Sequence, residues 1–167
     1  MYRVCILTLT LLSVPASAVS PQGLDKLAAY SGTWHTEMRR LDTPFSKAGS
    51  ESATLKNDCW RSAGFYACSQ FVNGESKALL VFLYDPAADR YTSHPIPAGG
   101  GEVRPGTLII KGNVWTFPWD DTEGGKTTHF RVVNTWRSPE SIDFRQEYST
   151  DGVHWTLMAD GREARVK

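Results

Sequence analysis

Cys59 and Cys68, the two ends of the stretch CWRSAGFYAC, are the residues of this sequence whose type and spacing best suit covalent or metal chemistry. A redox-active pair usually has two residues between its cysteines and stands at the start of a helix, whereas eight residues intervene here. A zinc site would need two more ligands from histidines that are scattered along the chain. The spacing therefore favours a structural disulfide between Cys59 and Cys68.

The residues around the two cysteines predict how this disulfide is built. Extended segments are predicted on both sides of Ser62-Ala63-Gly64, where the apolar pattern breaks. If the hairpin folds midway between Ala63 and Gly64, opposed residues approach closely enough for a disulfide. The sequence does not indicate which face of the hairpin points inward. The predicted opposed pairs are Cys59 with Cys68, Trp60 with Ala67, and Leu55 with Val72.

The four histidines are the next candidates for acid–base or metal chemistry. Strand alternation turns His35, His129 and His154 to the side opposite their aromatic neighbours, so a surface position is predicted for each. His94 lies where the strand pattern ends near a loop. At the mouth of a cavity its imidazole would suit a ligand contact, haem iron or a base, and an isomerase or hydrolase would need this group or an inward carboxylate.

Asp120, Asp121 and Glu123 form a small acidic group next to Trp119. Their spacing does not match a calcium-binding loop, so solvated turn residues are predicted and no metal is assigned. The chain has no Gly-x-Ser-x-Gly nucleophile motif, and its Gly-rich stretch 98–102 joins two strands instead of opening a helix. No catalytic residue and no cofactor are therefore assigned.

The N-terminal segment 1–18 has the features of a secretory signal peptide. Arg3 supplies a positive start, an apolar run follows, and Ala16-Ser17-Ala18 offers small residues at a cleavage site. The run is shorter than the roughly 20 apolar residues of a spanning helix. We expect cleavage after Ala18 and a periplasmic or secreted mature chain of residues 19–167, in a compartment where its two cysteines oxidise.

The charge of the chain narrows the classes of partner, and its length indicates the number of domains. The chain has 18 basic and 18 acidic residues, and neither kind forms a long run. A nucleic-acid or polybasic membrane-binding surface would need such an excess, so no nucleic-acid partner is predicted. No second apolar stretch approaches spanning length, so no membrane span is predicted either. The length of 19–167 suits one domain.

The pattern of the chain predicts the elements that position these residues. Ser20-Pro21 resembles a helix start and Ser31-Gly32 a stop, so a short helix is predicted over 19–31. From 32 to 167 the sequence reads as about ten short extended segments separated by Gly, Pro, Asn and Asp turns, among them a tight Gly112-Asn113 loop. Series of local hairpins favour an all-β, antiparallel up-and-down barrel of about eight to ten strands over a sandwich.

Gly32-Thr33-Trp34, directly after the predicted helix, resembles the Gly-x-Trp signature of lipocalins and the wider calycin group. The resemblance implies that Trp34 plugs the closed end of the barrel under an arginine from the last strand. Arg162 and Arg165 are the candidates, and Arg165 is favoured. Together with Tyr84-Asp85-Pro86, the segment 149–155 and Arg165-Val166, the motif is similar to domain-of-unknown-function family 1579. That family implies an exported, lipocalin-like barrel and no established catalytic residues.

The central strands carry the candidate ligand site. Alternate aromatic residues there would line the barrel, with Asn134 and Gln146 as polar contacts, or would simply fill it. The leading hypothesis is a barrel that binds a small apolar or amphipathic ligand, gated by the rim loops 97–104 and 120–126. The alternatives are an envelope module with a filled barrel and a protein partner, or an enzyme. The predicted ligand-binding residues are Trp115, Phe117, Trp119, Phe130, Asn134 and His94.

Overall fold

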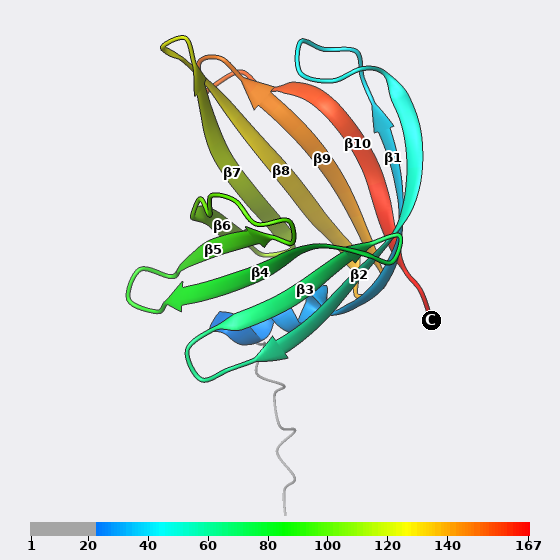
Figure 1. The fold of residues 1–167 in the computed structure, drawn as a ribbon, viewed down its shortest axis with the longest axis vertical. Coiled ribbons are helices and arrows are strands. Elements are labelled where there is room, and N and C mark those ends of the chain that lie inside the picture. Colours follow the sequence, from blue (N-terminus) through cyan, green and yellow to red (C-terminus); the bar gives the residue numbers. More distant parts are fainter. Residues whose placement is uncertain (1–22) are drawn as a thin grey trace, which may run out of the picture.

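The structure is a computed structural model in which residues 23–167 are described, and this part of the chain forms a closed antiparallel barrel of ten strands with one short helix before them (Figure 1). Each strand pairs with the next along the chain, and β1 pairs with β10 to close the barrel. The predicted up-and-down barrel is confirmed. The elements are η1 (Gly23–Tyr30), β1 (Gly32–Arg40), β2 (Gly49–Arg61), β3 (Tyr66–Val72), β4 (Glu75–Asp85), β5 (Arg90–Pro97), β6 (Gly106–Lys111), β7 (Val114–Glu123), β8 (Lys126–Ser138), β9 (Ser141–Ser149) and β10 (Thr156–Arg165).

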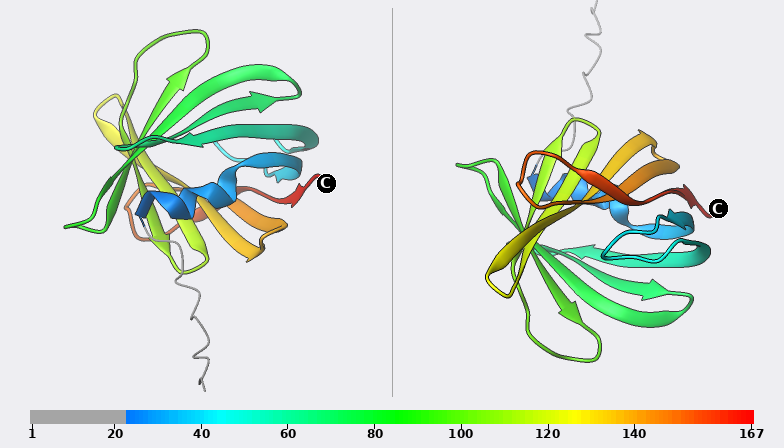
Figure 2. Two further views of the ribbon diagram at one scale, coloured as in Figure 1. Left: turned by 90° about the horizontal axis from the view of Figure 1, so that it is seen from below. Right: turned by 90° about the horizontal axis from the view of Figure 1, so that it is seen from above.

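Helix η1, a 3₁₀ helix, lies across one end of the barrel and contacts β2, β3 and β4 (Figure 2). Leu24 and Leu27 of this helix are buried, and the Tyr91 hydroxyl donates a 2.8 Å hydrogen bond to the Gly23 carbonyl. This apolar contact closes one end of the barrel. The predicted helix agrees with the structure over 23–30, whereas its first residues and the predicted signal peptide lie outside the described residues. Within 23–167, no helix is long and apolar enough to cross a membrane.

Short turns set the register of the hairpins. Lys111 pairs with Val114, which confirms the predicted two-residue Gly-Asn loop between β6 and β7. Asn73 and Gly74 both have positive φ, 52° and 83°, between β3 and β4. Such turns match the right-handed twist of the strands they connect, so consecutive strands stay paired and the barrel forms from local contacts.

The predicted disulfide is confirmed. Cys59 and Cys68 are bonded with their Cα atoms 4.0 Å apart, and β2 and β3 have the predicted register, with Trp60 opposite Ala67. Cys68 is buried whereas Trp60 is 45% exposed, so the cysteine-bearing face of the hairpin points into the barrel. The disulfide therefore joins β2 to β3 from the inside, near η1 and Tyr66.

The strands of the barrel wall share the fewest paired residues on either side of β6, and this part is called the thin wall. Strand β5 pairs with β6 only from Tyr91 to Ser93, and β6 pairs with β7 only as far as Thr116. Beyond that point the described part of β7 pairs with β8 alone, and Pro118 lies there, opposite Arg131. A proline lacks the N–H group that a second neighbouring strand would need, so this free edge can hold Pro118 without loss of a hydrogen bond.

Candidate ligand-binding cavity

Aromatic side chains fill the closed end of the barrel next to η1. Trp34 is fully buried, with its ring centre 5.7 Å from that of Trp136. Trp115 in turn lies 5.3 Å from Trp136 and 5.3 Å from Tyr30. The guanidinium of Arg165 lies 4.1 Å from the centre of the Trp34 ring. These residues form an aromatic layer that seals this end, so any open space lies beyond it.

Beyond the aromatic layer, strands from all sides of the barrel surround a cavity of about 350 Å³. Its walls are mainly apolar with a few polar groups, which is the composition expected of a small-molecule site. The apolar wall is formed by Met38, Ala53, Leu55, Val72, Leu80, Phe82, Phe117, Val132 and Phe144. The polar groups belong to Tyr30, Thr36, Gln70, Asn134, Gln146 and Glu163.

Glu163 and Thr36 form a polar spot in the cavity wall, and one side-chain oxygen of each residue lacks a hydrogen bond. They are directly opposed on β10 and β1. Glu163 Oε2 and Thr36 Oγ1 are both buried and have no hydrogen-bond partner among the described residues. Burial raises the pKa of the Glu163 carboxyl to about 7. Because buried polar atoms are nearly always partnered in proteins, these two atoms are candidates for hydrogen bonds to a bound molecule.

The polar groups of Tyr30, Asn134 and Gln70 are held by hydrogen bonds at the floor of the cavity. The Asn134 side-chain amide donates to the Tyr30 hydroxyl. Gln70 donates to the buried Asn57 side chain, which itself donates to the Tyr30 carbonyl, each at 3.4 Å. Burial, with a contribution from the charge of Glu163, raises the pKa of Tyr30 far above its ordinary value, so the phenol stays neutral. The floor therefore presents fixed, uncharged hydrogen-bonding groups.

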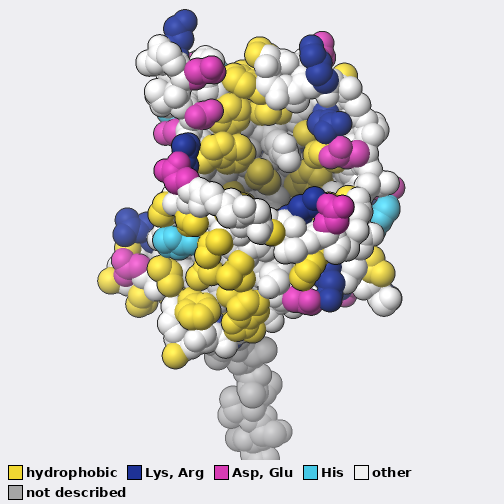
Figure 3. Space-filling model, in the orientation of Figure 1, with side chains coloured by type: hydrophobic (Ala, Val, Ile, Leu, Met, Phe, Trp, Pro, Cys, Tyr) yellow, Lys and Arg dark blue, Asp and Glu magenta, His cyan; other side chains and the backbone are white. Residues whose placement is uncertain are grey.

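Four aromatic side chains meet at the opposite, open end. Phe45, in the β1–β2 connection, lies with its ring centre 5.1 Å from that of Phe130 and 4.8 Å from that of Tyr148. Trp119 stacks on Phe130 at 5.4 Å. Phe45 and Trp119 are nearly half exposed, at 46% and 47%. Figure 3 shows the molecule hollowed in its upper half, with hydrophobic side chains around the hollow.

A second space of about 740 Å³ opens along the thin wall between β5 and β7. Trp119 and Pro95 lie on its border, together with the end of the 98–105 loop. It shares the wall residues Leu80, Phe82 and Phe117 with the interior cavity. This shared wall makes the gap beside β6 a candidate entrance to the interior.

The structure separates five of the six predicted ligand-binding residues into three places. Phe117 and Asn134 line the interior cavity. Trp119 and Phe130 lie at the open end. Trp115 is buried in the aromatic layer below the cavity, where it contacts Tyr30 and Trp136. Residues of one strand that were predicted to point inward together therefore do so, but they lie at different depths of the barrel.

His94 lies apart from these residues. It pairs with Val81 on the outer side of the wall, whereas its neighbours Ser93 and Pro95 border the second space. Its Nε2 atom is buried without a hydrogen-bond partner among the described residues. The structure also contains no group of three or more His, Cys, Asp or Glu side chains, within residues 23–167, that could hold a metal ion.

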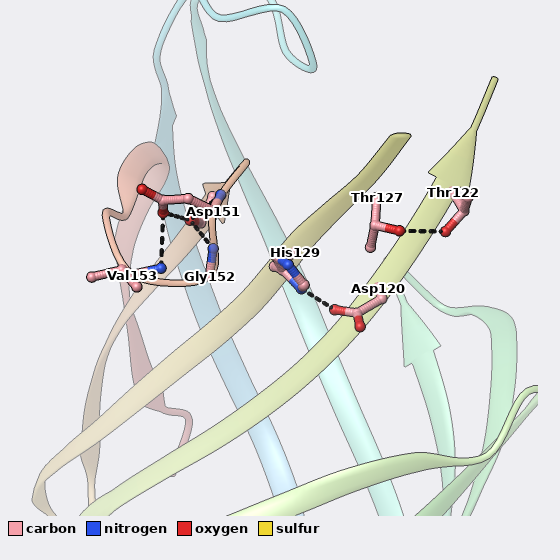
Figure 4. Close-up of polar contacts among 8 residues, drawn as sticks. Asp120, Thr122, Thr127, His129, Asp151, Gly152 and Val153 are labelled. Carbon is pink, nitrogen blue, oxygen red and sulfur yellow. Dashed lines mark hydrogen bonds and ion pairs between the residues drawn. The ribbon is translucent and has the colours of Figure 1, made fainter. Parts of the chain in front are cut away.

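Ser149, Asp151 and His154 have the residue types of a hydrolase triad but a different arrangement. Figure 4 shows Asp151 and its contact with the backbone of Val153. The Ser149 hydroxyl donates to Asp151 at 2.9 Å, and His154 Nδ1 lies 2.7 Å from the same carboxylate. Asp151 also accepts the backbone N–H groups of Val153 and His154. Asp151 therefore stabilises the turn before β10, and the hydroxyl is bonded to the carboxylate instead of the imidazole. His129, nearby, is bonded to Asp120 at 2.7 Å.

Most of the cavity lining was not predicted, including Glu163 and Thr36, and neither was Phe45 at the open end. A signal for the first two is present in the sequence. Because Arg165 is expected to pack on the inward Trp34, strand alternation places Glu163 and Thr36 inward as well. Phe45 has no such signal, since it lies in an irregular connection whose path depends on the rest of the barrel.

No protein-family model matches the chain, and no curated protein matches it. Among solved structures, the crystal structure of Rv2717c from M. tuberculosis is similar, with a TM-score of 0.46 and 10% sequence identity over 86% of this chain and 97% of that chain. Membership of family 1579 stays a prediction.

Proposed function

We propose that this protein is an exported barrel that binds a small, partly apolar ligand in its interior. The observation that supports the proposal most directly is the cavity of about 350 Å³, with an apolar wall and an unpartnered polar spot. A barrel that served only as a scaffold would gain stability by filling this space with side chains. The ligand would be held by burial of its apolar part, at about 0.8 kcal/mol per methylene group.

The two ends of the barrel have different roles in this proposal. The aromatic layer around Trp34 closes one end, so the ligand enters from the open end or through the gap beside β6. Phe45 and Trp119 offer exposed aromatic surface at the open end. Where the rim loop 120–126 was predicted, β7 and β8 stay paired to the tip of their hairpin. This hairpin tip, the loop after Pro97 and Phe45 would gate entry.

Export is the second part of the proposal. The Cys59–Cys68 disulfide supports it, because such bonds persist in oxidising compartments. The segment 1–18 would act as a signal peptide, and a periplasmic or secreted location would follow. Membership of family 1579, whose proteins are often exported, would be consistent with this location.

Native mass spectrometry of the chain exported to a periplasm tests the proposal. We expect a complex heavier than the disulfide-bonded chain, and one small molecule released on denaturing extraction. Ala53→Phe, which places a ring in the cavity, should remove that extra mass. The matched variant Ala164→Phe, on the outward row of β10, should keep it. A bare chain at its calculated mass in every case would contradict ligand binding.

A protein-interaction module is the second candidate function, and one observation favours it. Trp60, Leu83 and Ile96 are large apolar side chains exposed on the outer face of β2, β4 and β5, at 45%, 43% and 38%. Hydrophobic side chains gather on this part of the surface, over the lower strands in Figure 3. Exposed apolar patches of this kind often mark interfaces. Co-purification of a stoichiometric partner that Trp60→Ser and Leu83→Ser abolish would support this candidate.

A further inference from the structure

The described cavity wall has an acidic side chain and no basic one. Among the described residues that line the cavity, Glu163 is the carboxylate, and there is no Lys, Arg or His. The other polar atoms there belong to hydroxyl and amide groups. An ionised Glu163 therefore has no counter-ion in the cavity wall, and Oε2 has no hydrogen-bond donor among the described residues.

The groups that face Glu163 can be named for each neighbouring element. On β1 it is opposed by Thr36, and on β9 by Ile142. Tyr30, at the end of η1, is the titratable group that shares its surroundings, and it stays neutral. Asn134 of β8 directs its amide nitrogen to Tyr30, so its carbonyl oxygen remains an acceptor.

Two cationic side chains lie on the inward-facing rows of β1 and β10 that carry Thr36 and Glu163, but they bind other groups. Arg165, two residues beyond Glu163, donates to the carbonyl oxygens of Ser31 and Ala29 at 2.6 and 2.9 Å. Arg40, towards the open end of β1, pairs with Glu51 at 3.0 Å. Neither one lines the cavity. The carboxylate of Glu163 is therefore left for a cation that comes from outside the protein.

We propose that the cavity selects ligands with an amino group on an apolar body, and that the ammonium group binds Glu163 and Thr36. This inference rests on the proposed function and names the ligand class. The ammonium donates to the unpartnered oxygens of Glu163 and Thr36. The apolar body packs on Phe82, Phe117 and Phe144, whose ring faces also attract a cation. A carboxylate ligand of equal size would meet the like charge of Glu163 without a compensating cation.

Binding of a cation to Glu163 is also linked to pH. The pKa of its carboxyl is about 7 in the free protein, because burial disfavours the charged form. A bound ammonium group favours the charged form, so each binding event below that pH releases a proton. The ionised fraction of Glu163, and with it the affinity for an amine, should rise roughly tenfold between pH 6 and pH 8. The affinity for a neutral alcohol should change little over the same range.

Isothermal titration calorimetry of the disulfide-bonded protein with n-octylamine, 1-octanol and octanoate tests the inference. At pH 8 we expect octylamine to bind at least about tenfold more tightly than octanol, and octanoate to bind most weakly. Glu163→Gln should bring the affinity for octylamine to the level of that for octanol. The control Glu37→Gln, on the outward face of β1, should keep the preference for the amine. Buffers of different ionisation enthalpy should reveal proton release at pH 6 for the wild type.

The outcomes separate this inference from the proposed function. Equal binding of octylamine and octanol, or an amine preference that survives Glu163→Gln, overturns the choice of ligand class while the binding cavity stands. Failure of all three probes to bind overturns both, because the apolar wall alone should hold octanol. If Glu163→Gln does not fold, the wild-type pH profile decides, since a flat profile for octylamine overturns the role of Glu163.

Discussion

The guanidinium of Arg165 covers the ring of Trp34 at 4.1 Å and also binds carbonyl groups at the end of η1 and just after it. It donates to the Ala29 carbonyl at 2.9 Å and to the Ser31 carbonyl at 2.6 Å. Trp34 and Arg165 are opposed residues of β1 and β10, the pair of strands that closes the barrel. One side chain thus connects the two ends of the sheet and the helix that covers it.

Replacement of Arg165 by Met should destabilise the protein by about 2–4 kcal/mol. The variant loses a cation–π contact of about 0.5–2 kcal/mol and leaves carbonyl groups at the end of η1 without their donor. Urea denaturation at neutral pH measures the change. Arg162→Met is the control, because Arg162 is exposed and bonded to Asp143, and it should cost less than about 1 kcal/mol. Equal effects of the two variants would contradict the role assigned to Arg165.

Gly32→Ala should destabilise the protein through the same contact. Gly32 has a φ of +127°, and a Cβ atom there would lie 2.4 Å from Arg165 Nη1. The backbone strain and the displaced guanidinium together should cost about 1–3 kcal/mol. In a double-mutant cycle, Gly32→Ala and Arg165→Met should be less than additive, because each disturbs the same contact. Gly64→Ala, where a Cβ would meet nothing within 4 Å, is the control. Additive effects would show that Gly32 acts independently of Arg165.

Reduction of the Cys59–Cys68 disulfide should lower the free energy of unfolding by at most about 3 kcal/mol, since the bond closes a short loop. Urea midpoints with and without dithiothreitol measure this. The double variant Cys59→Ala, Cys68→Ala should unfold at about the midpoint of the reduced protein and should not respond to the reductant. A wild-type midpoint that dithiothreitol leaves unchanged, with full reduction shown by thiol labelling, would contradict a stabilising role.

Glu163 should make the protein less stable as the pH rises. Its pKa is about 7 in the folded state, above its ordinary value of 4.5, so the folded state binds its proton more tightly than the unfolded state does. The stabilising contribution is complete below pH 4.5 and is lost as the pH rises to about 7. Glu163→Gln should therefore gain about 1–3 kcal/mol relative to the wild type between pH 5 and pH 8.

The difference between wild type and Glu163→Gln isolates this effect from other titrating groups. Chemical denaturation of both proteins at each pH gives that difference. The control Glu37→Gln should show no comparable change with pH. A constant difference between wild type and Glu163→Gln over this range would show that the carboxyl titrates as it does in an unfolded chain.

The imidazole of His154 should titrate at a higher pH than an ordinary histidine. The Asp151 carboxylate, 2.7 Å from Nδ1, raises the pKa of His154. Asp151→Asn removes the charge and should lower that pKa, which ¹H NMR of the ring protons can follow. Asp121→Asn, an exposed change on β7, should leave it unaltered. If His154 titrates equally in the wild type and Asp151→Asn, the contact is absent in solution.

The sequence by itself determined the barrel, the disulfide and the register around it. These features depend on local information: turn residues at short intervals, alternation within strands, and two cysteines placed symmetrically about a break. Hairpins form from neighbouring segments, so residues such as Ala63 and Gly64 suffice to place Cys59 opposite Cys68. The inward face of β7 and β8 also follows from alternation.

Only the tertiary structure decided how deep each inward residue lies and what it meets there. Trp115, Phe117 and Trp119 share one face of β7, yet they lie in the aromatic layer, at the cavity and at the rim, because the barrel is closed at one end by η1 and open at the other. The pairing of Thr36 with Glu163 joins the first and last strands. That contact depends on closure of the whole barrel, which no local pattern of residues specifies.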